Sequence, residues 1–195
     1  MHIPKSFKVY GSVLSIALAL GAVGSVAHAA DTMAKEKTVM VGGAAMYPSK
    51  NIVENAVNSK DHTTLVAAVK AADLVGTLSS AGPFTVFAPT NEAFAALPAG
   101  TVDTLVKPEN KATLVKILTY HVVPGRLTST DIEKMAKANG GKAVLKTVQG
   151  ESITLAKAGS GWSVTDSKGK KAKITIANVM QSNGVIHVID GVLMP

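Results

Sequence analysis

A pair of residues near the C-terminus, Asn183-Gly184, lies between two apolar runs at residues 172–180 and 184–193. An Asn-Gly pair in this setting is a strong signal of a β-hairpin, because both central residues of its tight turn need a positive φ. Shorter runs predict three earlier strands, separated by turns that contain glycine, at residues 143–148, 152–156 and 162–165. The C-terminal part of the chain is therefore predicted to be an antiparallel meander.

The earlier half of the chain carries mainly helical patterns. Apolar residues recur at helical spacing after Asp61, which predicts a helix with Asp61 as its N-terminal cap. The other predicted elements are, in chain order, a strand at 84–88, a helix capped by Thr90, a short turn at 101–106, a helix at 109–118, a strand at 119–123, and a helix from the capping box at 130–133 to about Ala138. Helices with two early strands, followed by a meander, predict an α+β domain.

The first 29 residues have the layout of a secretory signal peptide. Lys5 and Lys8 form a basic start, residues 13–23 are apolar, and residues 27–29 (Ala-His-Ala) resemble a cleavage site. An uncleaved membrane anchor is the alternative, but about eleven apolar residues are few for a bilayer span of roughly twenty. We therefore expect cleavage near Ala29-Ala30, a secreted or periplasmic protein without a transmembrane segment after signal removal, an extended lead at 30–50 and one domain at 51–195.

The chain contains no cysteine. An exported protein without cysteine has no disulfide bonds, so packing alone must stabilise its fold. The same absence excludes a thiol nucleophile, a zinc site built from thiolates and attachment through a lipidated cysteine.

Positive charge is concentrated in the C-terminal half. The formal net charge of +7 becomes +5 when Lys5 and Lys8 are set aside, and residues 31–120 hold eight basic and eight acidic residues. The densest basic group is Lys168, Lys170, Lys171 and Lys173. If these lysines share one face, they can attract anionic polymers or membrane surfaces. The alternative is that they form a solvated hairpin tip with no binding role. A nucleic acid partner is not expected, because few arginines and aromatic residues accompany these lysines.

Three segments resemble the motifs of a known family. Residues 85–98 (TVFAPTNEAFAALP), 118–125 (LTYHVVPG) and 183–195 (NGVIHVIDGVLMP) are similar in order and spacing to the two outer motifs and the central Tyr-His motif of the fasciclin domain. The resemblance covers roughly residues 50–195, and the preceding lead is similar to that of bacterial single-domain exported members. It implies an α+β fold: a wedge-shaped antiparallel β-sandwich with several short helices packed along one side. It also implies adhesion to matrix, other cells or surface polymers, and no catalysis.

The resemblance also indicates where a partner would bind. In animal members of the family, the Tyr-His region and an Asp-Ile pair before the last hairpin are linked to integrin binding. Tyr120 and His121 match the first, and the second falls on Asn178 and Val179, where the carboxylate needed for an integrin-like metal contact is missing. These four residues are the candidate partner-binding set. Strand alternation would send Tyr120 and His121 to opposite faces, and the alternative role for both is to tie the strand to a neighbouring loop.

The sequence carries no motif for catalysis. The histidines after the leader, His62, His121 and His187, have no local metal-ligand spacing, and the chain lacks a nucleophile elbow and a phosphate-binding loop. We therefore expect no enzyme activity, cofactor or metal, and a monomer that binds a surface protein or polysaccharide. His187 lies among apolar residues and is expected to be a neutral, hydrogen-bonded residue of a buried strand. The alternative function is a periplasmic small-molecule or glycan-binding protein, in which a partly exposed Trp162 could stack on a sugar ring.

Overall fold

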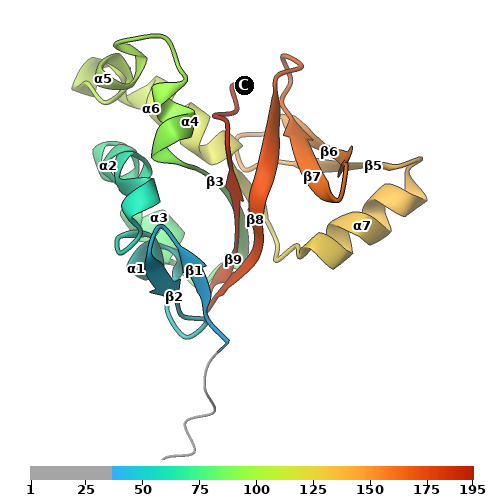
Figure 1. The fold of residues 1–195 in the computed structure, drawn as a ribbon. Helices are drawn as coiled ribbons and strands as arrows, with labels where there is room; N and C mark the ends of the chain where they lie inside the picture. The colour runs from blue at the N-terminus through green and yellow to red at the C-terminus, as the bar shows by residue number, and fades with distance from the viewer. Residues whose placement is uncertain (1–36) are drawn as a thin grey trace, which may run out of the picture. The chain divides into compact units, whose positions relative to one another are not determined.

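A computed structural model describes residues 37–195 of the chain (Figure 1). The predicted signal peptide and the first part of the predicted lead lie outside the described residues. Within the described range, the chain forms helices together with a large sheet, which confirms the predicted α+β class. Among these residues, no helix has both the length and the apolar character that crossing a bilayer requires.

Most helices are short, and they precede most of the strands. The helices are α1 (Ile52–Ala56), α2 (Thr63–Ala71), α3 (Val75–Ser79), α4 (Asn91–Ala95), α5 (Thr101–Leu105), α6 (Lys111–Tyr120) and α7 (Ser129–Ala138), with 3-10 turns at Lys60–His62 and Pro108–Asn110. The strands are β1 (Val39–Val41), β2 (Ala44–Met46), β3 (Phe84–Pro89), β4 (Val122–Pro124), β5 (Lys142–Lys146), β6 (Ser152–Ala158), β7 (Gly161–Thr165), β8 (Lys171–Gln181) and β9 (Gly184–Ile189).

Strands β3 to β9 form one sheet in the order β4-β3-β9-β8-β7-β6-β5. Neighbouring strands are antiparallel except β3 and β9, which run parallel, so the prediction of a wholly antiparallel arrangement is wrong at this pair. The sequence could not reveal this parallel pairing. Strands that are buried on both faces, as β3 and β9 are, are apolar throughout, and such a run does not show in which direction the strand pairs with its neighbour. The edges approach each other where the Val148 N–H donates a hydrogen bond of 2.8 Å to the Val122 carbonyl. The sheet is therefore mixed and nearly closed, and the predicted sandwich of two sheets is not confirmed.

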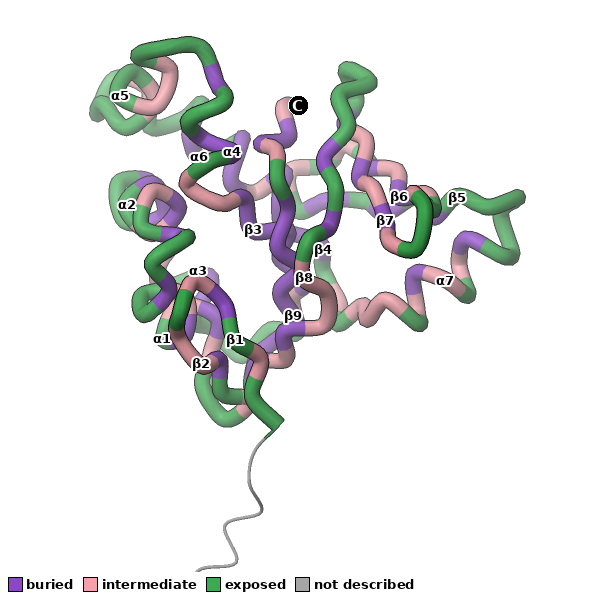
Figure 2. Tube along the Cα trace, in the orientation of Figure 1, coloured by how far each residue is buried: buried purple, intermediate pink, exposed green. Residues whose placement is uncertain are grey.

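Buried residues follow the strands of the sheet and the helices beside them (Figure 2), and their side chains form two clusters. The first packs helices α1, α2, α3, α4 and α6 against β3 and β9, and includes Leu65, Phe94 and Ile186. The second packs helix α7 against strands β5 to β8, and includes Ile132 and Leu155. Figure 1 shows α7 apart from the other helices. The prediction that the helices pack along one side is therefore wrong for α7, whose apolar stripe covers the meander.

The predicted lead at residues 30–50 is described from residue 37 onward, where it contains a hairpin of β1 and β2. Its two-residue turn is Gly42-Gly43, with φ of 57° and 76°, which glycine adopts without strain. Val41 and Met46 are buried in the first cluster. This hairpin therefore contributes to the same core as the segment predicted to be the domain.

The predicted hairpin at Asn183-Gly184 is present, but its turn differs from the expected one. Gln181 pairs with Gly184, so the central residues are Ser182 and Asn183, and Asn183 does not have a positive φ. Gly184 is needed for a different reason: a Cβ there would lie 2.1 Å from the carbonyl oxygen of Phe84 in β3. The close parallel pairing of β3 and β9 therefore depends on a residue without a side chain at this position.

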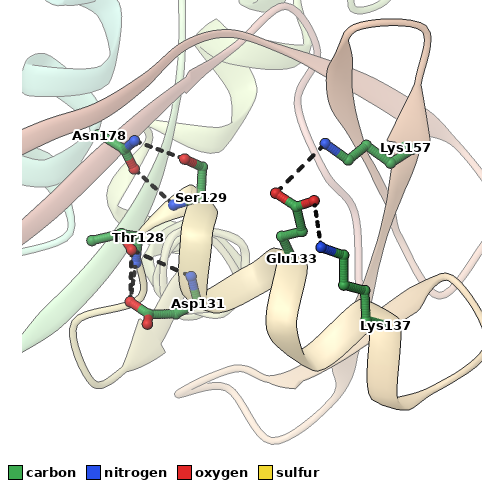
Figure 3. A network of polar contacts seen from close by, with 7 residues as sticks. All are labelled: Thr128, Ser129, Asp131, Glu133, Lys137, Lys157 and Asn178. Atoms are coloured by element: carbon green, nitrogen blue, oxygen red, sulfur yellow. Dashed lines mark hydrogen bonds and ion pairs between the residues drawn. The ribbon is translucent and has the colours of Figure 1, made fainter.

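Two helix starts also differ from prediction. Helix α2 begins at Thr63 with His62 as its N-cap, and a 3-10 turn that includes Asp61 precedes it. The capping box of α7 is formed by Thr128 and Asp131: the Asp131 N–H donates to the Thr128 hydroxyl, and the Thr128 N–H donates to the Asp131 carboxylate (Figure 3). Helix α7 ends at Ala138 as predicted. The cap of α2 is shifted by one residue and the capping box of α7 by two, in elements whose type is correct.

Candidate functional site

The Tyr120-His121 pair ends a helix and is not on a strand. Helix α6 extends through Tyr120, His121 is its C-cap, and β4 begins at Val122, so the strand predicted at residues 119–123 is present at 122–123 and wrong at 119–121. The apolar stripe of α6 at Leu114, Ile117 and Leu118 continues to position 121, which is one helical turn further. Neither side chain faces solvent, since Tyr120 is 0% and His121 2% exposed. They do lie in different surroundings, with Tyr120 in the second cluster and His121 beside the first.

The Tyr120 hydroxyl joins three parts of the fold. It donates a hydrogen bond of 3.2 Å to the carbonyl of Ser152 at the start of β6, and accepts one of 2.9 Å from the N–H of Ser167. Ser167 lies in the turn between β7 and β8. Burial raises the pKa of Tyr120, so the hydroxyl stays protonated and can donate. Helix α6 is thereby attached to the turn that carries the predicted basic residues.

The His121 imidazole holds the C-terminal segment. Its Nε2 accepts a hydrogen bond of 3.0 Å from the N–H of Leu193, so Nδ1 carries the proton and donates to the Ile117 carbonyl at 2.9 Å. Burial lowers the pKa of His121 to about 4, which keeps the ring neutral at pH 7. The alternative role foreseen for this residue, a structural tie to a neighbouring segment, is the one that its contacts support.

A buried carboxylate braces the basic turn from inside. Asp166 Oδ1 accepts hydrogen bonds from the N–H groups of Lys168 and Lys170, at 3.0 and 2.8 Å. Asp166 Oδ2 accepts from the N–H of Met194 at 3.1 Å. Residues 166–170 are therefore tied to α6 through Tyr120 and to the C-terminal segment through Asp166, while the lysine side chains of the turn remain exposed.

The register of the meander places further lysines beside this turn. One cross-strand row on the outer face of β5 to β8 is Lys142, Ala156, Ser163 and Lys173. The next row is Val144, Thr154, Thr165 and Lys171, and Lys146 follows on β5 opposite Ser152. We call the exposed Lys142, Lys146, Lys171 and Lys173, together with the small residues between them, the lysine face. With strands about 4.8 Å apart, the lysines of β5 and β8 lie about 14 Å from each other.

The lysine face extends the basic group predicted from sequence, since Lys142 and Lys146 were not among its predicted members. The signal was present in residues 142–146 (KAVLK), where exposed and buried residues alternate. Acidic side chains flank the face at two places. Asp190 accepts the N–H of Lys173 at 2.6 Å, and Glu151 precedes β6. The face therefore keeps an excess of positive charge.

Asn178 and Val179 have structural roles. Asn178 has a φ of 60°, a conformation that Asn tolerates better than most residues. Its side-chain oxygen accepts the N–H of Ser129 and its amide donates to the Ser129 hydroxyl, both at 2.7 Å, which holds the start of α7 (Figure 3). Val179 is buried in the first cluster. The structure thus offers no exposed surface at Val179, Tyr120 or His121, and only Asn178 of this candidate set is partly accessible.

His187 is buried and hydrogen-bonded, as the sequence predicted. Its Nε2 donates to the Leu127 carbonyl at 2.9 Å, its Nδ1 accepts the N–H of Asn178 at 3.3 Å, and its ring stacks on Phe87. Burial lowers its pKa, so it is neutral at pH 7. Trp162, expected to be partly exposed, is buried in the second cluster with the Lys157 amino group over its ring. Within residues 37–195, no group of three or more metal-ligating side chains could hold a metal ion.

The anchoring of the basic turn gives a first prediction. Replacing Tyr120 with Phe removes only the hydroxyl and leaves the Ser152 carbonyl and the Ser167 N–H without their partner. We expect the free energy of unfolding to fall by about 1–2 kcal/mol. We also expect faster amide hydrogen exchange at Ser167 and Lys168, measured by NMR, with little change in β3. Tyr47, which is partly exposed and outside this network, offers the control variant Tyr47→Phe. Equal exchange rates in both variants would show that Tyr120 does not anchor the turn.

Comparison with known proteins finds relatives over most of the chain. The sequence model of the fasciclin domain matches residues 60–195. Protein sll1483 of Synechocystis sp. is 52% identical over 162 residues, covering 82% of this chain and 82% of that protein. Immunogenic protein MPB70 of Mycobacterium bovis is 37% identical over 145 residues, covering 72% of this chain and 66% of that protein. A solved FAS1 domain pair from the insect cell adhesion molecule fasciclin I has a TM-score of 0.67 at 20% identity, covering 76% of this chain and 52% of that chain.

Proposed function

Because the chain belongs to the fasciclin domain family, we propose that it is a non-enzymatic adhesion or recognition module that binds an anionic polymer on a surface. The observation that carries this proposal is the lysine face. Of the four candidate partner-binding residues, Tyr120, His121 and Val179 are buried in structural contacts, whereas the lysines are exposed on the sheet. The partner-binding residues of the proposal are therefore Lys142, Lys146, Lys171 and Lys173, with Lys168 and Lys170 in the adjacent turn.

The shape of the face favours an extended partner. Between the lysine pairs of β5 and β8 lie Ala156, Ser163, Thr154 and Thr165, which are small and half-buried. Small side chains leave room for a chain to lie across the strands, and the three hydroxyls offer donors and acceptors to sugar hydroxyls. Lysine is a flexible, hydrated point charge, which suits carboxylate or sulfate groups at variable spacing. A polysaccharide with repeated anionic groups matches both features.

Two buried residues, of which Tyr120 belongs to the set that the family resemblance indicated, support the lysine face indirectly. Tyr120 and Asp166 fix the β7–β8 turn, so Lys168 and Lys170 project from a held backbone. Pre-organised contact residues lose less conformational entropy on binding. The proposal also requires that the protein meets its partner outside the cytoplasm, in agreement with the secreted or periplasmic destination predicted from the leader.

The proposal predicts a specific effect of charge reversal. We expect Lys142, Lys146, Lys171 and Lys173, all replaced by Glu, to weaken binding to polygalacturonate by at least about tenfold at low ionic strength. Binding of the unaltered protein should weaken steeply as salt is added, because exposed charges are screened. Isothermal titration calorimetry measures both effects. The matched control reverses four exposed lysines of the helical side, Lys60, Lys107, Lys111 and Lys116, with the same change in net charge.

Two results would contradict this assignment. If both quadruple variants lose the same affinity, net charge alone explains binding and the lysine face has no special role. If neither loses affinity, or if cells lacking the gene attach to polyanion-coated surfaces as well as complemented cells do, anionic polymers are not the partner. Circular dichroism of each variant establishes that the fold is retained.

A further inference from the structure

The first cluster of buried side chains borders a cavity of about 90 Å³. It lies between helices α1, α2 and α3 and strand β3, with apolar walls that include Ile52, Leu65, Val69 and Val86. Protein interiors contain few voids larger than a water molecule. An apolar cavity of comparable size stays dry and takes up small apolar molecules. The space is therefore suited to a hydrocarbon chain.

One buried nitrogen in the cavity wall has no hydrogen-bond partner within residues 37–195. His62 is 3% exposed, and its Nδ1 forms a hydrogen bond of 2.8 Å with the Ser59 hydroxyl, while its Nε2 has none among the described residues. Burial lowers the pKa of His62, and this lowering is opposed by the Ala88 backbone and by the charge of Asp61. Buried polar atoms in folded proteins are nearly always paired. An oxygen atom of a ligand would supply the missing partner.

A positive charge lies at the other end of the same helix. Lys70 is exposed and lines the cavity near the end of α2, and among the described lining residues it is the one with a permanent charge. Val66 and Val75 are half-exposed and Thr77 is exposed, so the wall is open to solvent on this side. From His62 to Lys70 the helix rises about 12 Å at 1.5 Å per residue. The cavity thus has a buried polar atom at one end of α2 and a cation at the other.

We propose that the cavity binds a slender aliphatic carboxylate that carries a second oxygen at its far end. Its carboxylate pairs with Lys70 at the rim, its chain fills the space along α2, and its far oxygen hydrogen-bonds His62 Nε2. An apolar cavity of roughly 150 Å³ takes up benzene, so this space of about 90 Å³ holds roughly four carbon-sized groups, and the remaining groups of the chain lie on the open side beside Lys70. This site goes beyond the adhesion proposed above, which uses the opposite part of the chain and does not require the cavity.

The test compares two ligands that differ by one hydroxyl, octanoate and 8-hydroxyoctanoate, by calorimetric titration of the purified protein. Burying the chain should give octanoate a dissociation constant on the order of 100 μM. The hydroxyl compound should bind about tenfold more tightly, and His62→Phe should remove this difference. Lys70→Gln should weaken both ligands about two- to fivefold. Lys116→Gln, which removes a charge from an exposed position outside the cavity wall, serves as the control and should change neither.

Filling the cavity separates this site from binding elsewhere on the protein. Val66→Phe adds volume to the wall and should abolish binding of both ligands, and Ala56→Leu gives a second filled cavity if the first variant does not fold. The proposal is overturned if the unaltered protein binds neither ligand at millimolar concentration, or if it binds both equally well. It is also overturned if folded cavity-filled variants keep full affinity, because the ligand would then lie outside the cavity.

Discussion

Replacing Asn183 with Ala is expected to lower the free energy of unfolding by about 3–5 kcal/mol, because one side chain satisfies three backbone groups, two of them through buried hydrogen bonds. Its Oδ1 accepts the N–H of Ile52 at 3.0 Å. Its Nδ2 donates to the carbonyls of Leu78 and Ser80, both at 2.8 Å. Asn183 is 6% exposed, so water cannot easily replace these bonds. Truncation would leave one donor and two acceptors unpaired, each at a cost of about 1–3 kcal/mol.

These bonds connect the turn between β8 and β9 to helix α1 and to the end of helix α3. Loss of the connection should therefore loosen the helices around the first cluster more than the meander. Chemical denaturation measures the stability change, and hydrogen exchange of α1 and α3 locates it. Asn58→Ala is the control, because exposed Asn58 donates one bond of 2.7 Å to the Glu54 carbonyl and should cost less than about 1 kcal/mol. Similar losses in the two variants would show that Asn183 acts only as a turn residue.

Asn183 also shows how a sequence signal can be right for a different reason. The Asn-Gly pair predicted a hairpin, and one forms, but the positive φ on which the prediction rested is absent from Asn183. The amide is used for three long-range bonds, and the glycine for close approach of β3. Both uses depend on segments about a hundred residues away. Local patterns cannot specify such contacts, which arise only once the fold brings those segments together.

The error at residues 119–121 has a related cause. A stretch of five residues can satisfy a period of two and a period of 3.6 at once. Positions 119, 121 and 123 share a strand face, while 114, 117, 118 and 121 share a helical stripe. Residues 119 and 120 become helical because the helix has already formed before them, and each added residue completes another hydrogen bond to the preceding turn. Strand β4 starts after the helix ends, and its pairing with β3 then buries both Val122 and Val123.

The candidate site was predictable only in part. Four lysines of the basic group are close in sequence, so composition alone reveals them. Lys142 and Lys146 lie some thirty residues earlier and reach the same face because three successive strand pairings bring β5, β6, β7 and β8 into one register. The alternation of polar and apolar residues showed which side chains of β5 face outward. It did not show that β8 is the third strand from β5 in the sheet. The resemblance singled out Tyr120 and His121 as partner-binding residues, and the contacts that both side chains make are structural.

Three buried histidines give the second large expected effect, a loss of stability in mild acid. His62, His121 and His187 each have a pKa lowered by burial. In the unfolded chain these rings bind a proton as the pH falls through about 6.5, whereas the folded protein resists protonation. Stability is therefore fully present above pH 6.5 and declines as the pH falls. Asp131 and Glu133, whose pKa values are lowered by hydrogen bonds and by Lys137, keep their contributions above pH 4.5 and do not act in this range.

The size of the effect is clearest for His121, whose pKa is lowered from 6.5 to about 4. At about 1.36 kcal/mol per unit, this residue alone removes about 3 kcal/mol of stability between pH 6.5 and pH 4, and the other two histidines add to the loss. Protonation of Nε2 would also replace the acceptor of the Leu193 N–H with a donor, which releases the C-terminal segment. Urea denaturation at half-unit steps from pH 7.5 to pH 4 measures this decline. His121→Asn should be less stable at pH 7 yet lose about 3 kcal/mol less on acidification, and identical pH profiles for the two proteins would mean that His121 does not control acid stability.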